Sequence, residues 1–459
     1  MRTGPQCGGV IINSGPMASE TLSQVPYALD RRKELAGQPY FQILLIGVSA
    51  YRHLLGGCAE SRGANALRLG QLNTPTATAV KLYEWLLRAD HEKRLPYPIG
   101  TATLLLAPSP TESPYVSSVL SPEKWASPTR AGIEQAIRRF QGDILACEHE
   151  AARKDGSNPP GLGLYYFGGH GVDGGRDDPI ILTEDVLAPN EAQSGANAIA
   201  QAEITTLLTQ YSAEDGAGKT SAQRTQLFII CDCCREATAK AAPEAIEPDL
   251  FFDVHEAPPE PRDHRVLWAT APRLAATGLA RLLDQFASHG QPLTALGHLL
   301  ITCLEWADEE NLDQRNTLPL RLSTSRLAEH IADSWRELAT ILEELGGKLD
   351  GKPESKSSGP AFSMYFGRSQ PEARIRLRCS PEDLYHKLHV SIRRDQFERR
   401  IPAPWTKHPE SITLVPHLFD VEFGTAEALP ALTRRIPVRL AVRDTVWEFR
   451  RDQLEICSS

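Results

Sequence analysis

Two short stretches of this sequence end in side chains that could do chemistry. Residues 165–171 have the sequence YYFGGHG, in which His170 follows an apolar run. Residues 228–236 have the sequence FIICDCCRE, in which a similar run ends in three cysteines and Asp232. A neutral imidazole can deprotonate a nearby thiol, and an imidazolium can stabilise the resulting thiolate. The residue types therefore indicate a cysteine nucleophile paired with a histidine.

The glycines around His170 favour this interpretation. A lone histidine is more often a packing or surface residue, and a lone cysteine in a strand is more often a small buried hydrophobe. Gly168, Gly169 and Gly171 make sense if the backbone must approach a substrate closely, whereas packing alone predicts no such cluster.

The elements that position these residues are predicted from the apolar pattern. Apolar runs bounded by chain breakers are typical of buried strands, and parallel strands present their carboxyl ends at one edge of a sheet. We therefore expect His170 and the cysteines to meet there. Further strands are predicted at 43–48, 101–106, 264–271 and 361–367, and helices at 76–89, 129–154, 203–211, 292–306 and 324–345. This alternation predicts an α/β fold, a three-layer α/β/α sandwich with a mostly parallel sheet.

The chain of 459 residues is long enough for two or three domains. Residues 1–38 are polar and aperiodic, which predicts a flexible arm, and residues 39–368 make up the α/β domain. Residues 108–128 and 346–359 are predicted to be loops, and 178–185 a short hairpin or an edge strand. Residues 369–459 contain short alternating strands, which predict a separate β-rich, sandwich-like domain.

Composition limits the function classes. A net charge of −9 argues against nucleic-acid binding, which requires a basic face. No run approaches the roughly 20 apolar residues that cross a bilayer, and the first residues do not resemble a secretory signal peptide. Nine irregularly spaced cysteines favour free thiols in a reducing compartment. We expect a cytoplasmic protein with neither membrane nor nucleic-acid partners.

Together, the two stretches resemble the active-site motifs of the caspase-like cysteine peptidase superfamily, which includes caspases, metacaspases and prokaryotic relatives. Its members carry an apolar strand ending in His-Gly and a later strand ending in Asp-x-Cys or Gln-x-Cys. ILLIGVSAY from Ile43 and VLWATAP from Val266 also resemble strands of this family. The resemblance spans residues 42–367, excludes the β-rich part, and implies a caspase-like fold with cysteine endopeptidase activity.

The resemblance assigns roles to individual residues. His170 matches the catalytic histidine, and Cys234 matches the nucleophile because it stands two places after Asp232. The N–H groups of Gly171 and Cys234 match the oxyanion hole, which stabilises the tetrahedral intermediate. If the strand continues as far as Cys234, strand parity places Asp232 and Cys234 on the same side. Cys233 is the alternative nucleophile.

The resemblance also implies a substrate class. Asp232 matches the aspartate that, in metacaspase-like members, pairs with arginine or lysine of the substrate, and a buried carboxylate favours such a cationic partner. Those members have a second pocket aspartate where this chain has Thr78. Trp268 lies in the strand that borders the family's substrate groove, although core packing explains a tryptophan equally well. The expected partners are protein and peptide substrates.

No cofactor is expected. Calcium is the alternative, because some metacaspases bind it and because Asp173, Asp177 and Asp178 cluster after His170, but acidic loops also arise for solubility. Zinc at the cysteine cluster and His170 is disfavoured, since paired C-x-x-C spacing is absent. The sequence has no phosphate-binding loop motif.

The acidic, proline-rich residues 241–262 lie where caspases carry their inter-subunit linker. Basic residues in and around this region would suit self-cleavage or an upstream activating protease, so we expect a zymogen; these are Lys219, Arg224, Lys240 and Arg262. Bacterial relatives often serve in regulated cell death or antiviral defence. The competing hypothesis is a catalytically inactive caspase-like module that binds partners, but the presence of both motifs weighs against it.

Overall fold

The computed structural model describes most of the chain between residues 25 and 458. The described ranges are 25–61, 69–152, 161–173, 179–188, 197–209, 225–233, 264–268, 292–306, 320–344, 353–358, 363–367, 373–394, 397–405, 409–414, 418–425, 432–437, 444–450 and 454–458.

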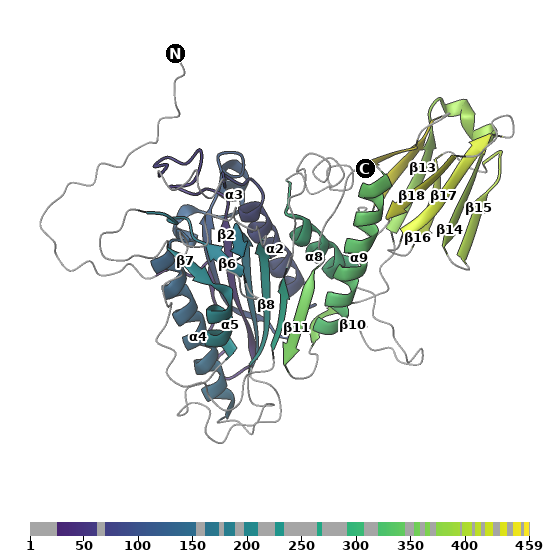
Figure 1. The fold of residues 1–459 in the computed structure, drawn as a ribbon. Coiled ribbons are helices and arrows are strands. Elements are labelled where there is room, and N and C mark those ends of the chain that lie inside the picture. The colour runs from purple at the N-terminus through teal and green to yellow at the C-terminus, as the bar shows by residue number, and fades with distance from the viewer. Residues whose placement is uncertain are drawn as a thin grey trace, which may run out of the picture.

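A seven-stranded sheet forms the centre of the described α/β part (Figure 1). The five inner strands are parallel to one another, and each outer strand is antiparallel to the strand beside it. The inner strands are almost continuous apolar runs, as expected for parallel strands covered on both faces. In spatial order the strands are β1 (Leu29–Asp30), β3 (Ile99–Ala107), β2 (Tyr40–Val48), β4 (Gly161–Gly169), β8 (Gln226–Cys233), β9 (His264–Trp268) and β11 (Glu354–Ser358).

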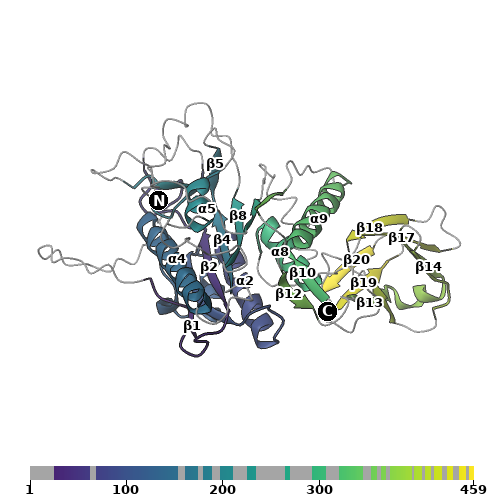
Figure 2. The same ribbon diagram turned by 90° about the horizontal axis from the view of Figure 1, so that it is seen from below.

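Helices cover both faces of this sheet (Figure 2). On one face lie α2 (Pro75–His91) and α8 (Ala295–Trp306), and α9 (Thr324–Glu344) packs on α8. On the other face lie α4 (Arg130–Ala152) and α5 (Gln201–Thr209). Alternate residues of β2 enter the two cores, with Ile43 on the α2 face and Leu44 on the α4 face. The predicted mixed α/β class is confirmed.

Several elements occupy segments that the sequence predicts as arm or loop. β1 lies within the predicted arm 1–38 and pairs with β3, so this part of the arm belongs to the sheet. The predicted loop 108–128 contains α3 (Ser113–Val119) and the short helix η1 (Pro122–Lys124). α3 has a proline in its first turn and buries Val116, a single apolar residue that gives no periodic pattern. β11 has the sequence ESKSS and is held by backbone pairing to β9, which periodicity cannot detect.

The strand predicted at 361–367 forms outside the main sheet. It is β12 (Ser363–Gly367), and it pairs with β10 (Leu320–Ser323) in a two-stranded sheet. The predicted hairpin at 178–185 belongs to a three-stranded antiparallel sheet of β5 (Gly171–Asp173), β6 (Pro179–Leu182) and β7 (Ala198–Ala200). This small sheet begins directly after His170.

The β-rich C-terminal part has a hydrophobic core of its own, which includes Ile375, Val421 and Trp447. Two four-stranded sheets contribute to it, in the orders β16-β13-β19-β20 and β15-β14-β17-β18. Their strands are β13 (Ala373–Cys379), β14 (Leu388–Arg394), β15 (Phe397–Ile401), β16 (Glu410–Leu414), β17 (Leu418–Thr425), β18 (Leu432–Pro437), β19 (Asp444–Phe449) and β20 (Leu454–Ser458), with the short helix η4 (Glu382–His386) between β13 and β14.

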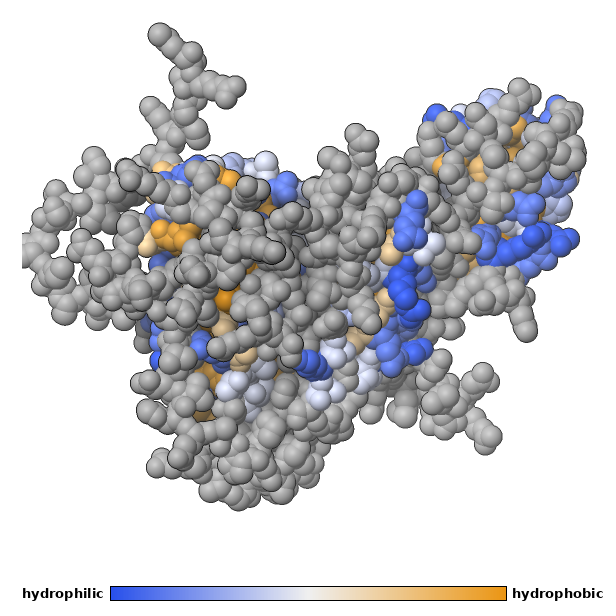
Figure 3. Space-filling model, viewed as in Figure 1, coloured by the Kyte–Doolittle hydropathy of each residue, from blue (hydrophilic) through white to orange (hydrophobic). Residues whose placement is uncertain are grey.

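The surface around α9 is polar. Figure 3 shows a hydrophilic ridge over this helix, which carries the ion pairs Arg326–Glu329 and Arg336–Asp333. The opposite side of α9 buries Leu327, Ile331 and Trp335 in the core that α2 and α8 share. The helix therefore has one core face and one charged face.

Candidate active site

The ends of β4 and β8 lie side by side. The two strands are parallel, and their register pairs Gly168 with Asp232 and Gly169 with Cys233. The residue that follows β4 is His170, and the residue that follows β8 is Cys234. The structure describes His170 at this edge of the sheet, whereas Cys234 lies outside the described residues.

His170 is buried, with 7% of its surface exposed, and is held by fixed polar contacts. Its Nε2 lies 2.9 Å from the carbonyl oxygen of Gly70, and its backbone N–H donates to the Tyr51 hydroxyl at 2.6 Å. A carbonyl oxygen only accepts, so the contact with Gly70 requires a proton on Nε2 and leaves Nδ1 as the basic nitrogen of the neutral ring.

Burial lowers the pKa of His170 to about 4, and the hydrogen bond to Gly70 opposes this shift. The imidazole is therefore neutral at pH 7, as a proton acceptor requires. The orientation that presents Nδ1 is set by backbone rather than by an acidic side chain.

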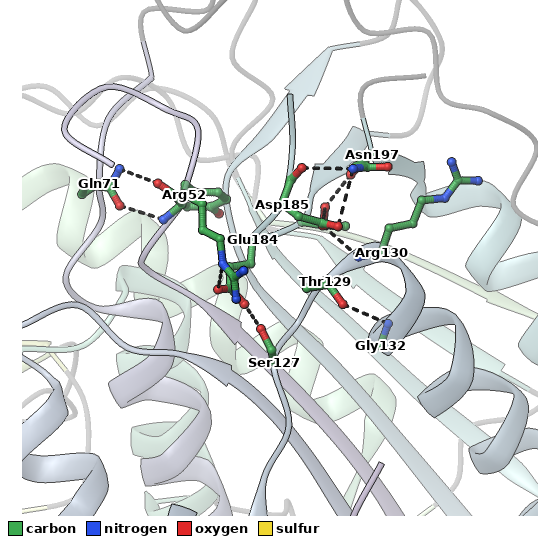
Figure 4. Close-up of polar contacts among 11 residues, drawn as sticks. Arg52, Gln71, Ser127, Thr129, Arg130, Gly132, Glu184, Asp185 and Asn197 are labelled. Atoms are coloured by element: carbon green, nitrogen blue, oxygen red, sulfur yellow. Dashed lines mark hydrogen bonds and ion pairs between the residues drawn. The ribbon is translucent and has the colours of Figure 1, made fainter. Parts of the chain in front are cut away.

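The loop segments that contact His170 are tied to each other. Gln71 accepts the backbone N–H of Tyr51 at 2.7 Å and donates to the Tyr51 carbonyl at 3.0 Å. Figure 4 shows Gln71 beside Arg52, with both atoms of its amide engaged. Gln71 follows Gly70 directly and is bonded to the backbone of Tyr51. These two hydrogen bonds therefore help to hold both the Gly70 carbonyl and the Tyr51 hydroxyl, which contact His170.

A second set of contacts ties these loops to the small sheet (Figure 4). Glu184 accepts from Arg52 Nε at 2.7 Å and from the Ser127 hydroxyl. Asn197 donates to the carbonyl of Asp185 at 3.1 Å. Burial raises the pKa of Glu184, and the Arg52 guanidinium opposes this shift. The segment after β6 is thus anchored to the loop that carries Tyr51.

Gly168 and Gly169 have a packing role. A Cβ at Gly168 would lie 2.8 Å from the Tyr166 hydroxyl, and a Cβ at Gly169 would lie 2.8 Å from the Tyr51 hydroxyl. Side chains at these positions would displace the two hydroxyls. The expectation that packing gives no reason for Gly168 and Gly169 is therefore wrong. The sequence alone does not show which hydroxyls occupy the space beside them.

Asp232 is a buried carboxylate, with 7% of its surface exposed. Its Oδ2 accepts from the Tyr166 hydroxyl at 2.9 Å and from the Thr294 hydroxyl. Burial raises the pKa of Asp232 to about 6, and hydrogen bonds from Thr294, Tyr166 and the Gly297 backbone oppose this rise. Among the described residues, these partners are neutral.

Thr78 lies within the same network. Its Oγ1 accepts the backbone N–H of Thr294 at 3.0 Å and donates to the Thr74 carbonyl at 2.8 Å. The structure therefore links Thr78 to Asp232 through Thr294, which precedes α8. Sequence reasoning missed Thr294 and Tyr166. Strand parity could have indicated Tyr166, because it lies on the face of the sheet that also carries Asp232.

Cys231 and Cys233 lie on the opposite face of β8 from Asp232. Both side chains belong to the core beneath α4 and α5, with 0% and 3% exposed, and their sulfur atoms are 3.2 Å apart. The alternative nucleophile Cys233 thus lies in the core, away from the carboxylate.

Other predicted site residues are described only in part. Gly171 opens β5, paired with Ile181. Trp268 ends β9, where its backbone pairs with Cys231, but its side chain lies outside the described residues. The side chain of Asp173 and residues 177 and 178, the predicted calcium ligands, also lie outside the described residues. So do the predicted cleavage positions, which are Lys219, Arg224, Lys240 and Arg262.

The described residues contain neither a candidate metal cluster nor a candidate membrane span. No group of three His, Cys, Asp or Glu side chains there is arranged to hold a metal ion. No helix in the same part of the chain combines the length and apolar character needed to cross a membrane. Comparison of the sequence with protein-family models and with curated proteins found no match.

Proposed function

We propose that this chain is a caspase-like cysteine endopeptidase that uses His170 and Cys234 and cleaves proteins after arginine or lysine. The observation that carries this proposal is the register of β4 and β8, which pairs Gly169 with Cys233. That register supports close approach of the residues that follow the two strands. These are His170, an oriented neutral imidazole, and Cys234. Cys233 is less suitable as the nucleophile, because its thiol is buried on the other face.

The proposed reaction begins with proton transfer from the Cys234 thiol to Nδ1 of His170. The thiolate attacks the carbonyl carbon of the scissile peptide bond, and the N–H groups of Gly171 and Cys234 stabilise the negative oxygen. The imidazolium then protonates the leaving amine, which departs and leaves a thioester. Water attacks the thioester with His170 as general base, and this step releases the acid product and the thiol.

Asp232 is the proposed partner of the substrate's cationic side chain. Among the described residues, the partners of its carboxylate are neutral donors, and burial beside neutral groups alone is unfavourable for the charged form. A guanidinium or ammonium group would supply the missing positive charge through a charge-assisted hydrogen bond. A substrate with an acidic residue at this position would be repelled.

The wider organisation belongs to the same proposal. We assign residues 39–368, together with β1, to the peptidase domain and 369–459 to a β-rich domain; the helices on both sheet faces and the separate C-terminal core support this division. Activation by cleavage at Lys219, Arg224, Lys240 or Arg262, and a role in bacterial cell death or antiviral defence, rest on the family resemblance. The proposed cytoplasmic location rests on the irregularly spaced cysteines. Intact-mass measurement of the active form tests the processing step, and full activity of an uncut chain would refute it.

The test of the proposed function is cleavage of fluorogenic peptides ending in arginine, lysine or aspartate before the reporter. We expect turnover of the basic peptides and its loss in Cys234→Ala and His170→Ala. Cys233→Ala serves as the matched control and should keep its activity. Loss in Cys233→Ala with retention in Cys234→Ala would refute the assigned nucleophile, and absence of cleavage by the unaltered, processed chain would favour the inactive binding module.

A further inference from the structure

We propose that Thr294 and Tyr166 are positioning residues for substrate specificity: their hydroxyls orient the Asp232 carboxylate and keep it ionised for the cationic side chain of the substrate. This inference rests on the proposed function. It adds two residues from distant segments, one preceding α8 and one within β4.

The hydrogen-bond network fixes the direction in which Thr294 donates. Its Oγ1 accepts the backbone N–H of Gly297 at 3.1 Å, as a residue preceding a helix commonly does. Thr78 already donates its hydroxyl proton to Thr74. The hydroxyl proton of Thr294 is therefore available for Asp232, with which it forms a short contact.

Tyr166 approaches the carboxylate from the neighbouring strand. It is fully buried, and its hydroxyl donates to Asp232 Oδ2 at 2.9 Å. Gly168 makes this approach possible, since a Cβ there would lie 2.8 Å from the hydroxyl oxygen. Gly168 is also the residue of β4 that pairs with Asp232.

A glycine makes room on the α8 side as well. A Cβ at Gly297 would collide with the side chain of Thr78 and with Oγ1 of Thr294. The absence of a side chain at Gly168 and at Gly297 thus preserves the space that each donor occupies. The two glycines belong to different elements, and both border the same carboxylate network.

The groups that face Asp232 can be named by element. β4 supplies Tyr166; α8 supplies the Gly297 N–H, preceded by the Thr294 hydroxyl; and α2 supplies Thr78 behind Thr294. The titratable group among them is Tyr166, whose pKa is raised by burial and by the charge of Asp232, so it stays a neutral donor. The ionisation of Asp232 therefore depends on how many neutral donors it keeps.

The variants Thr294→Val and Tyr166→Phe each remove one hydroxyl and change the shape of the side chain little. Both should move the acidic limb of kcat/KM for an arginine peptide to higher pH, by about one unit for one hydrogen bond to a charged group. KM should rise and kcat should change less, since the donors act on substrate binding. Thr294→Ser keeps the hydroxyl and should restore the unaltered profile.

Thr340→Val is the matched control. This α9 threonine donates to the Arg336 carbonyl within its own helix and has no place in the network. Its pH profile should equal that of the unaltered chain. Thermal unfolding of each variant confirms folding, and because the two donors come from separate elements, either variant alone tests the proposal.

The outcomes separate this inference from the proposed function. If the unaltered chain cleaves basic peptides and Cys234→Ala does not, the proposed function stands. If Thr294→Val and Tyr166→Phe then keep the original pH profile and KM, the positioning role is refuted. The same conclusion follows if Thr294→Ser shifts the profile as far as Thr294→Val. Absence of cleavage in the unaltered chain refutes the function itself, and with it this inference.

Discussion

Replacing Asp232 by asparagine should change how the stability of the protein depends on pH. Burial raises the pKa of Asp232 from 3.8 to about 6, whereas the unfolded chain keeps an ordinary value near 3.9. A raised carboxyl pKa means that the folded state binds the proton more tightly than the unfolded state. The stabilisation of the folded state by the protonated Asp232 carboxyl is fully present below about pH 4 and is lost as the pH rises through about 6.

The magnitude follows from the size of the shift. A change of about two pKa units, at about 1.4 kcal/mol per unit, corresponds to about 3 kcal/mol of unfolding free energy. Asparagine does not titrate, so the difference in unfolding free energy between Asp232→Asn and the unaltered chain should change by about 2 kcal/mol between pH 4 and pH 7, since the unfolded carboxyl is already half ionised at pH 4. Any constant offset from altered hydrogen bonds cancels in this comparison.

His170 contributes the opposite slope. Burial lowers its pKa from 6.5 to about 4, so its contribution to stability is present above pH 6.5 and is lost as the pH falls through about 4. In the unaltered chain the two contributions oppose each other over the same pH range. His170→Gln should therefore lose stability relative to the unaltered chain by about 3 kcal/mol more at pH 7 than at pH 4.

Urea unfolding followed by tryptophan fluorescence at several pH values between 4 and 7 measures both differences. The double variant with Asp232→Asn and His170→Gln should lack both of these pH-dependent contributions to the unfolding free energy. A constant difference between Asp232→Asn and the unaltered chain across this range would refute the reasoning, because it would mean that Asp232 titrates equally in the folded and unfolded states.

Two further predictions concern the support of His170, and a third is the control for one of them. Tyr51→Phe removes the acceptor of the His170 backbone N–H and should lower kcat on a basic peptide about tenfold, the value of roughly one hydrogen bond; unchanged kinetics would contradict this role. Gly169→Ala places a Cβ 2.8 Å from the Tyr51 hydroxyl and should destabilise the protein by about 1–3 kcal/mol in urea unfolding. Gly142→Ala in α4 is its matched control, since a Cβ there meets no atom within 4 Å, and it should instead stabilise the protein by about 0.5–1 kcal/mol; equal effects of the two alanines would show that the space beside Tyr51 can adapt.

The main strands could be predicted because parallel strands covered on both faces are continuous apolar runs. The runs that end at Val48, Gly169 and Cys233 each correspond to a strand of the central sheet. β11 could not be found in this way, because ESKSS contains no apolar residue and the strand depends on backbone hydrogen bonds to β9. Pairing of that kind leaves no trace in hydrophobic periodicity.

The candidate site was predictable at the ends of strands and less so across elements. The motifs single out His170 and Asp232, and the resemblance brings in Thr78. Thr294, which joins Thr78 to Asp232, comes from a helix start about 60 residues beyond Asp232 in the sequence and belongs to no recognisable motif. The same limit applies to Gly168, whose packing role depends on the position of a hydroxyl from its own strand.

Covalent labelling tests the pairing of His170 and Cys234 most directly. A peptide chloromethyl ketone with a terminal arginine should alkylate the active protein once, and peptide mapping by mass spectrometry should place the label on Cys234. His170→Ala should react much more slowly, while Cys233→Ala should react as the unaltered chain does. Labelling at Cys233, or equal labelling with and without His170, would contradict the proposed dyad.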